Sequence, residues 1–277
     1  MKNKKQVAIV IPFYKNGLSA LEAISLTQCV KTLSDYPIFV IKPASLELSA
    51  ITDEFRSLEI ISFEDFYFEG VEGYNRLMLS PDFYQKFLAF EFILIHQLDA
   101  FVFRDELPKW CASGYDYIGA PWLKRLADPD MIKALKTRLV TRYHIFRNTF
   151  ENGLPSDRQF DNKVGNGGFS LRRVKKFYDL SIKFNDLIQE YHKREEHQFH
   201  EDVFWSIEVN RKTKNLNIPR YKKALLFSFE NRLEQSMKHT NNQLPFGCHA
   251  WDQHMNFWRP YFKNLGYALP DSIDTRD

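Results

Sequence analysis

One carboxylate follows directly on an apolar run. In the stretch FEFILIHQLDAFVF, residues 90–96 are mostly apolar, and Asp99 comes before the chain turns apolar again. A buried, unpaired charge is costly, so Asp99 needs a salt bridge, a helix cap or a metal ion. With Gln97 two residues earlier, QLD is an incomplete form of the Asp-x-Asp pattern that holds a divalent cation against a nucleotide diphosphate. Such cations take hard oxygen ligands and leave part of their shell for phosphate oxygens.

Two further motifs have residue types that suit chemistry. GNGGFS (165–170) has three glycines in four positions, which indicates either a tightly packed loop or backbone that leaves room for a ligand. It is neither a Walker motif nor GxGxxG. HEDVFW (200–205) places Glu201 and Asp202 together at the expected start of a helix. Acidic residues there are either helix caps or a general base that takes a proton from an attacking hydroxyl.

Histidine and cysteine supply weaker candidates. His249 in FGCHAW is either a structural residue or a metal ligand, and Cys248 beside it lacks partners at zinc spacing. A cluster of three histidines lacks the HExxH form and predicts a solvated face: His192, His197 and His200.

The elements that must position these residues begin with four short apolar runs, typical of strands buried on both faces: 7–12, 37–43, 58–63 and 90–97. Helical spacing of apolar residues lies between them, in 16–33 and 46–56. This alternation predicts a parallel α/β sheet. Asp99 would then lie just beyond the carboxyl end of a strand, where ligands bind in open α/β sheets.

The second half has a different character. Residues 115–122 predict a short strand leading into a turn, and 164–173 predict a glycine-rich turn that runs into a helix over 174–180. A helix with an acidic first turn is expected over 200–212. No internal repeat or low-complexity linker interrupts the chain. We therefore expect one continuous domain over 1–277, with a nucleotide-binding half (1–105) and an acceptor-binding half (106–277).

The segment 123–148 has seven Lys or Arg residues against two Asp, with an apolar row at Met131, Leu135 and Leu139. It is either a solvated helix face or a flap that touches an anionic acceptor, such as a lipid diphosphate or an acidic glycan, at a membrane surface.

Composition narrows the class of protein. The 277 residues are 44% hydrophobic and 26% charged, which is ordinary for a folded soluble chain, and 16% aromatic, which mildly favours sugar or base binding. A net charge of +3 is too small to indicate nucleic acid. Three separated cysteines indicate a reducing compartment. The apolar run at the N-terminus is too short for a signal peptide, and no stretch reaches the ~20 apolar residues of a membrane span. We therefore expect a cytoplasmic protein, with possible peripheral contact at the inner membrane face through 123–148.

The order of these motifs resembles the GT-A class of nucleotide-sugar glycosyltransferases. More closely, the chain resembles a family of glycosyltransferase-like proteins known mainly as a domain of unknown function. The resemblance spans residues 11–251 through the following motifs: IPFYK, GYNRLMLS, FILIHQLDAFVFRDEL, WCASGYDYIGAPW, VGNGGFSLR, HEDVFW, LFSFE and PFGCHAW. It implies a GT-A-like, Rossmann-related fold with a mixed, mostly parallel sheet.

The resemblance also implies residue roles. Asp99 and His249 would be metal ligands for Mn²⁺ or Mg²⁺, Asp202 the catalytic base and Glu201 the residue that positions the acceptor. Donor binding is implied for Pro12, Phe13, Tyr14, Lys15, Asn75, Arg76, Gln97, Asp99, Gly167 and Gly168. Gln97 departs from the family's metal motif, in which an acid is common at this position.

The implied function is transfer of a sugar from a nucleotide-diphosphate sugar, with UDP favoured, to a hydroxyl of a glycan or lipid-linked acceptor in surface-polysaccharide biosynthesis. We expect inversion at the sugar and help from the metal. Two alternatives stay open: a sugar nucleotidyltransferase, and a non-catalytic glycan- or nucleotide-binding protein on the same fold. Against the first, no glycine-rich pyrophosphate loop follows the first strand, because IPFYKNG has one glycine.

Overall fold

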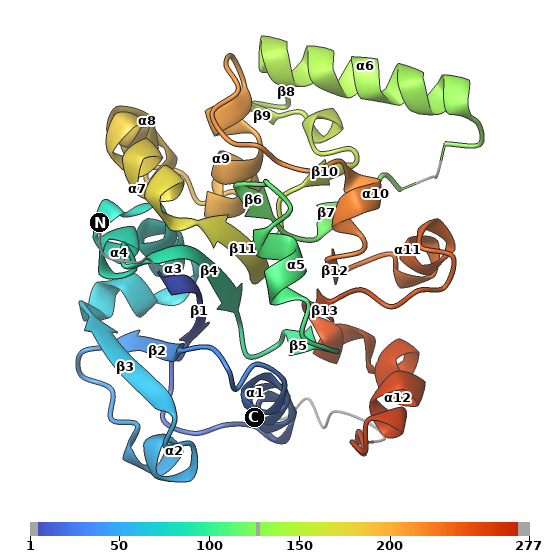
Figure 1. Ribbon diagram of the computed structural model, residues 1–277. Coiled ribbons are helices and arrows are strands. Elements are labelled where there is room, and N and C mark those ends of the chain that lie inside the picture. Colours follow the sequence, from blue (N-terminus) through green and yellow to red (C-terminus); the bar gives the residue numbers. More distant parts are fainter. Residues whose placement is uncertain (1–4, 126–127, 271–277) are drawn as a thin grey trace.

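Figure 1 shows a computed structural model of the chain, which describes residues 5–125 and 128–270. Its centre is a six-stranded sheet with the order β3-β2-β1-β4-β11-β6. The strands are β1 (Lys5–Pro12), β2 (Ile38–Pro43), β3 (Leu58–Phe63), β4 (Phe90–His96), β11 (Phe169–Arg173) and β6 (Tyr117–Ile118). The predicted mixed, mostly parallel sheet is therefore confirmed.

The four strands predicted from apolar runs are parallel neighbours. Ile9 of β1 stands opposite Ile38 of β2 and Leu94 of β4. Side chains alternate between the two faces of a strand. Accordingly, Ala8 and Val10 pack into one buried cluster and Ile9 packs into another on the opposite face. Burial on both faces explains why these strands are continuous apolar runs.

One central strand was not predicted from the sequence. Residues 164–173 were expected to form a glycine-rich turn that leads into a helix. Instead, Phe169–Arg173 forms β11, antiparallel to both β4 and β6. Strands from both sides of residue 105 therefore build the same sheet.

The helices include α1 (Ala20–Thr32), α2 (Ser49–Glu54), α3 (Gly70–Leu79), α4 (Pro81–Lys86), α5 (Leu107–Cys111), α6 (Met131–Arg147), α7 (Val174–Lys183), α8 (Asn185–Tyr191), α9 (Glu201–Ser206), α10 (Tyr221–Ala224), α11 (Leu233–His239) and α12 (Met255–Asn264). Short 3-10 helices cover Asp65–Phe68, Asp157–Gln159, His197–Phe199, Glu208–Asn210 and Trp251–His254. Within the described residues, no helix is long and apolar enough to cross a membrane.

Several predicted helices are shorter than their patterns. The first begins at Ala20, because Ser19 forms a capping box: its hydroxyl accepts from the backbone N–H of Glu22, whose carboxylate accepts from Ser19 N–H. The helix expected over 200–212 ends at Ser206 and a 3-10 turn follows. In the basic segment, the helix covers Met131–Arg147, and residues 126 and 127 lie outside the described residues.

Small sheets complete the second half. β12 (Ser228–Phe229), β13 (Gly247–Cys248) and β5 (Phe101–Val102) form one of them. β7 (Pro121–Trp122) pairs with β10 (Lys163–Val164), and β8 (Phe150–Glu151) with β9 (Leu154–Pro155). The pairing of β13 with β5 matters for the site. Cys248 stands opposite Phe101, which brings the late FGCHAW motif to the segment just after Asp99.

Candidate active site

The central sheet has a topological switch point between β1 and β4. From β1 the chain passes outward to β2 and β3, and then returns to place β4 on the other side of β1. Ligands of open α/β sheets bind in the crevice beyond the carboxyl ends of strands at such a point. A cleft of about 360 Å³ lies there, and its lining includes Pro12, Tyr14, Gln97, Asp99, Trp251 and Asp252. That volume falls in the range typical of small-molecule sites.

Asp99 and His249 meet at this cleft. His249 Nε2 lies 3.2 Å from Asp99 Oδ1. The backbone holds the two segments together, because Trp251 N–H donates to the carbonyl of Asp99 at 3.3 Å. The two residues that the family resemblance implies as metal ligands are therefore in contact. Burial alone would raise the pKa of Asp99, but the charge and hydrogen bond of His249 outweigh it and hold the pKa below its ordinary value.

The imidazole of His249 is held from both sides. Nε2 also lies 2.9 Å from Gln97 Oε1, and Nδ1 lies 3.4 Å from Glu230 Oε1. Burial would lower its pKa, but Asp99 and Glu230 together raise the pKa of His249 to about 10. The two carboxylates therefore favour the protonated form of His249.

Two members of this network were not among the predicted site residues. Asn166 Nδ2 donates to Glu230 Oε1 at 2.6 Å and lies 3.1 Å from His249 Nδ1. The side-chain Oδ1 of Asn166 accepts from the backbone N–H of Gly168 at 3.1 Å. Both residues belong to motifs that the family resemblance quoted, GNGGFS and LFSFE, but a lone Asn and a lone Glu give no spacing signal of their own.

Gly167 and Gly168 are needed because neither position has room for a side chain. A Cβ on Gly168 would lie 2.0 Å from His249 Nε2 and 2.6 Å from Gln97 Oε1. On Gly167 it would lie 2.1 Å from Glu201 Oε1. Of the two alternatives for this turn, the contacts support tight packing, here against Glu201, His249 and Gln97.

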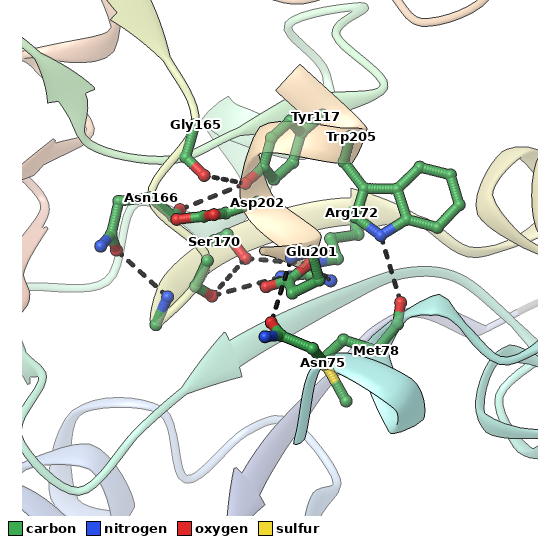
Figure 2. Close-up of polar contacts among 12 residues, drawn as sticks. Asn75, Met78, Tyr117, Gly165, Asn166, Ser170, Arg172, Glu201, Asp202 and Trp205 are labelled. Carbon is green, nitrogen blue, oxygen red and sulfur yellow. Dashed lines mark hydrogen bonds and ion pairs between the residues drawn. The ribbon is translucent and has the colours of Figure 1, made fainter. Parts of the chain in front are cut away.

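Glu201 lies in a buried ion pair. Its two carboxylate oxygens accept from Arg172 at 3.0 and 2.9 Å, and the side chains are 4% and 0% exposed, respectively. Arg172 also donates to the hydroxyls of Ser170 and Tyr84, each at 3.0 Å. The expectation that Glu201 positions an acceptor is corrected, because Arg172 engages both oxygens inside the protein. Figure 2 shows Glu201 at the start of α9 with Arg172 and Ser170.

Asn75, predicted to bind the donor, instead helps to seat α9. Its Oδ1 accepts from the backbone N–H of Glu201 at 3.0 Å. Trp205, also on α9, donates from its indole N–H to the carbonyl of Met78 at 3.1 Å (Figure 2). Two hydrogen bonds to α3 therefore hold the short helix that carries Asp202.

Asp202 differs from its neighbour. Its Oδ1 accepts from the N–H of Val203 at 2.8 Å, and its side chain leaves the helix in a different direction from that of Glu201 (Figure 2). Burial, reinforced by the charges of Glu201 and Glu230, raises the pKa of Asp202 well above the ordinary aspartate value. This shift brings the carboxyl closer to the pKa that suits a general base near neutral pH, and its electrostatic partner Glu230 belongs to the His249 network.

The residues of the loop after β1, all predicted to bind the donor, lie in different environments. Phe13 is fully buried in the core, so it holds the loop in place and offers no surface to a nucleotide base. Tyr14 is 44% exposed and lines the cleft, with the rings of Phe68 and Tyr74 behind it. Lys15 is exposed and pairs with Glu22 at 3.1 Å.

Arg76 is not brought to the cleft. It is exposed on α3, and its charge contributes to the lowered pKa of His192 at the end of α8. Burial is the larger cause of that shift, so His192 is partly buried, contrary to the solvated face predicted for its cluster.

The donor atoms at the cleft can be tested against a divalent cation. Among the described residues, no group of three or more His, Cys, Asp or Glu side chains is placed to hold a metal. With Gln97 included, three donor atoms converge: Gln97 Oε1 and Asp99 Oδ1 lie 2.9 and 3.2 Å from His249 Nε2. Neighbouring ligands of an octahedral ion with bonds of ~2.1 Å stand roughly 3 Å apart. The two separations from His249 Nε2 match that spacing, and the set contains one carboxylate charge.

Solved structures share this architecture. A galactosyltransferase, LgtC, in complex with donor and acceptor sugar analogues matches with a TM-score of 0.55 at 13% identity, over 95% of this chain and 98% of LgtC. Mouse xyloside xylosyltransferase 1 matches with a TM-score of 0.50 at 9% identity, over 88% of this chain and 97% of that one. At these identities the likeness shows the fold, which is the GT-A-like fold of glycosyltransferases.

The family follows from a separate comparison. Residues 57–249 match the model of a family described as "Protein of unknown function (DUF5672)", and the chain belongs to this family. No curated protein matches the chain.

Proposed function

We propose that the protein is a glycosyltransferase that moves a sugar from a nucleotide-diphosphate sugar to an acceptor hydroxyl. The observation that carries the proposal is the meeting of Gln97, Asp99 and His249 at the switch-point cleft of a GT-A-like fold. The structural neighbour LgtC was solved with donor and acceptor sugar analogues, which supports this class of substrate.

The cleft would hold the donor between β1 and β4. Pro12 and Tyr14 line the β1 side, where the exposed ring of Tyr14 suits stacking on a base. Gln97, Asp99 and His249 would hold Mn²⁺ or Mg²⁺, which supplies positive charge against the leaving diphosphate. Lys15 directly follows Tyr14. It would add a second cation if its exposed ion pair with Glu22 opened.

Asp202 is the general base of the proposed reaction. It removes the proton from the acceptor hydroxyl while the oxygen forms a bond to the anomeric carbon and the bond from that carbon to the diphosphate breaks. A single displacement inverts the configuration at the sugar. A positioned base contributes ~10²–10⁴-fold in rate. Because Oδ1 also accepts from Val203 N–H, the carboxylate pairs with one free N–H in the first turn of α9 and keeps its second oxygen for chemistry.

The acceptor and the cellular compartment complete the proposal. We propose that the acceptor is a glycan or a lipid-linked sugar in surface-polysaccharide biosynthesis. The three cysteines of the chain are free and buried, which supports a reducing compartment such as the cytoplasm.

Two experiments test the proposal. Hydrolysis of a panel of nucleotide sugars with Mn²⁺ present should identify a donor. Calorimetry with UDP should show tighter binding with Mn²⁺ than without it, and His249→Ala should remove the difference. The alternative is a non-catalytic binding protein, which the single carboxylate of the proposed cation site also allows. Such a protein would bind UDP equally with and without Mn²⁺ and would hydrolyse no donor.

A further inference from the structure

Helix α6 (Met131–Arg147) carries most of its large apolar side chains on its solvent-facing side. Its large apolar side chains face solvent: Met131 (89% exposed), Ile132 (82%), Leu135 (54%), Leu139 (59%), Tyr143 (59%) and Phe146 (63%). The side toward the protein is mixed. Thr137 bonds Asp128 and Lys124, Thr141 is buried and His144 bonds Thr149, and the apolar residues that are only partly exposed lie beside them: Ala134, Val140 and Ile145. A surface helix of a folded domain normally shows the opposite arrangement.

The six apolar side chains form one surface. At 100° per residue, positions 131, 132, 135, 139, 143 and 146 fall within a single sector of the helix, and we call this surface the α6 stripe. Exposed apolar residues are scattered elsewhere in the described chain, so the concentration on one helix marks a surface that is covered in function. Figure 1 shows α6 along the edge of the molecule, where it is open to an outside partner.

The charges around the α6 stripe have one sign. The helix contains five Lys or Arg residues and no Asp or Glu. By the same spacing, Lys136 and Arg147 border one side of the stripe, Arg138 borders the other, and Arg142 lies within the stripe near the Arg138 side. All four side chains are exposed.

We propose that α6 lies flat on the surface of an anionic lipid bilayer, with the α6 stripe in the headgroup–acyl boundary and its flanking cations on the lipid phosphates. Helices that bind this way combine a large apolar face with Lys and Arg beside it. At ~1.5 Å per residue, 17 residues make a contact about 25 Å long.

Charge decides among the possible occupants. A second copy of the chain would bring two sets of basic flanks together, and like charges across an interface oppose pairing. Nucleic acid would be attracted to the cations but offers little to Ile132, Leu135 and Leu139. Only an anionic bilayer satisfies the apolar stripe and the cations in one contact.

The test is co-sedimentation of the full chain with vesicles, which does not depend on sugar transfer, so its failure leaves the proposed function standing. Vesicles of phosphatidylcholine alone are compared with vesicles that also contain phosphatidylglycerol. We expect binding only with phosphatidylglycerol, weakened by added salt.

Matched double variants separate the two contributions. Lys136→Gln with Arg142→Gln should weaken binding by roughly 25-fold, because each cation near an anionic surface is worth about fivefold. Leu135→Gln with Leu139→Gln should weaken it at least as much. Controls remove equivalent exposed residues elsewhere: Lys86→Gln with Lys238→Gln, and Val71→Gln with Ile182→Gln. Circular dichroism checks that the fold is kept.

Three results would overturn the proposal. The first is no sedimentation of the unmodified chain with phosphatidylglycerol vesicles. The second is equal binding by the α6 variants and the control variants, which would place the contact on another face. The third is a dimer in analytical ultracentrifugation that Leu135→Gln with Leu139→Gln dissolves, which would assign the α6 stripe to a second copy.

Discussion

We predict opposite effects on stability when each of the two adjacent carboxylates of α9 is neutralised. Glu201 is buried against Arg172, whereas Asp202 is the proposed base. Glu201→Gln keeps the shape of the side chain but removes its charge. The Arg172 guanidinium, fully buried, would then have only neutral partners: the hydroxyls of Ser170 and Tyr84 and the new amide.

The expected size follows from that burial. Removing one partner of a buried ion pair leaves an uncompensated charge and destabilises a protein by about 3–5 kcal/mol. For a chain of this length, each kcal/mol lowers the melting temperature by about 2 °C, so Glu201→Gln should melt roughly 6–10 °C below the unmodified chain. Exposed ion pairs are worth at most about 1 kcal/mol, so Lys193→Gln, which breaks an exposed pair with Glu190, is the matched control.

Asp202→Asn should not lower the free energy of unfolding at neutral pH. Because the folded state raises the pKa of Asp202, this group contributes stability that is present at pH below the unfolded value, near 4, and is lost as pH rises through the folded value. The asparagine variant escapes that loss and should be no less stable at neutral pH.

Urea unfolding followed by tryptophan fluorescence measures both variants, and donor turnover is measured in parallel. The reasoning is refuted if Glu201→Gln unfolds within about 1 kcal/mol of the unmodified chain, or if Asp202→Asn is the less stable of the two.

Three further predictions concern the cleft. Gly168→Ala should displace the His249 ring, because the new Cβ would lie 2.0 Å from Nε2, and calorimetry should show weaker metal-dependent UDP binding; unchanged binding would contradict the geometry. The acid limb of donor turnover should lie well above pH 4 because the pKa of Asp202 is raised, and a pH–rate profile with its limb at ordinary aspartate values would remove Asp202 as the base. Gln97→Asp adds a second carboxylate to the cation site, so Mn²⁺ titration should show tighter binding than in the unmodified chain.

The sequence predicts the first half of the fold because that half follows one rule. A parallel strand covered on both faces must be apolar along its whole length, and the runs at 7–12 and 58–63 give strands that end within two residues of the pattern. β11 breaks the rule, since Arg172 lies in the middle of a central strand. Its charge is tolerated only because Glu201 reaches it from α9, and no local pattern carries that partner.

The site was predictable only as far as single motifs allow. An aspartate after a buried strand indicates a ligand-binding edge, and Asp99 lies there. That His249 joins it depends on the pairing of β13 with β5, two strands of two residues each, which are too short to leave a periodic signal. Glu201 shows the opposite failure, because an acid at a helix start fits a cap, a base and a buried ion pair equally well.

The charges at the cleft explain why we expect the metal and the nucleotide to bind cooperatively. His249 lies between the carboxylates of Asp99 and Glu230, so even with a protonated ring this group is net negative and would repel a diphosphate. In the proposed reaction, Gln97, Asp99 and a neutral His249 would hold a divalent ion, which would add positive charge where the diphosphate arrives. One carboxylate would hold such an ion weakly, and phosphate oxygens would supply further ligands. Metal and donor should therefore bind as a pair, each raising the affinity for the other by the same factor.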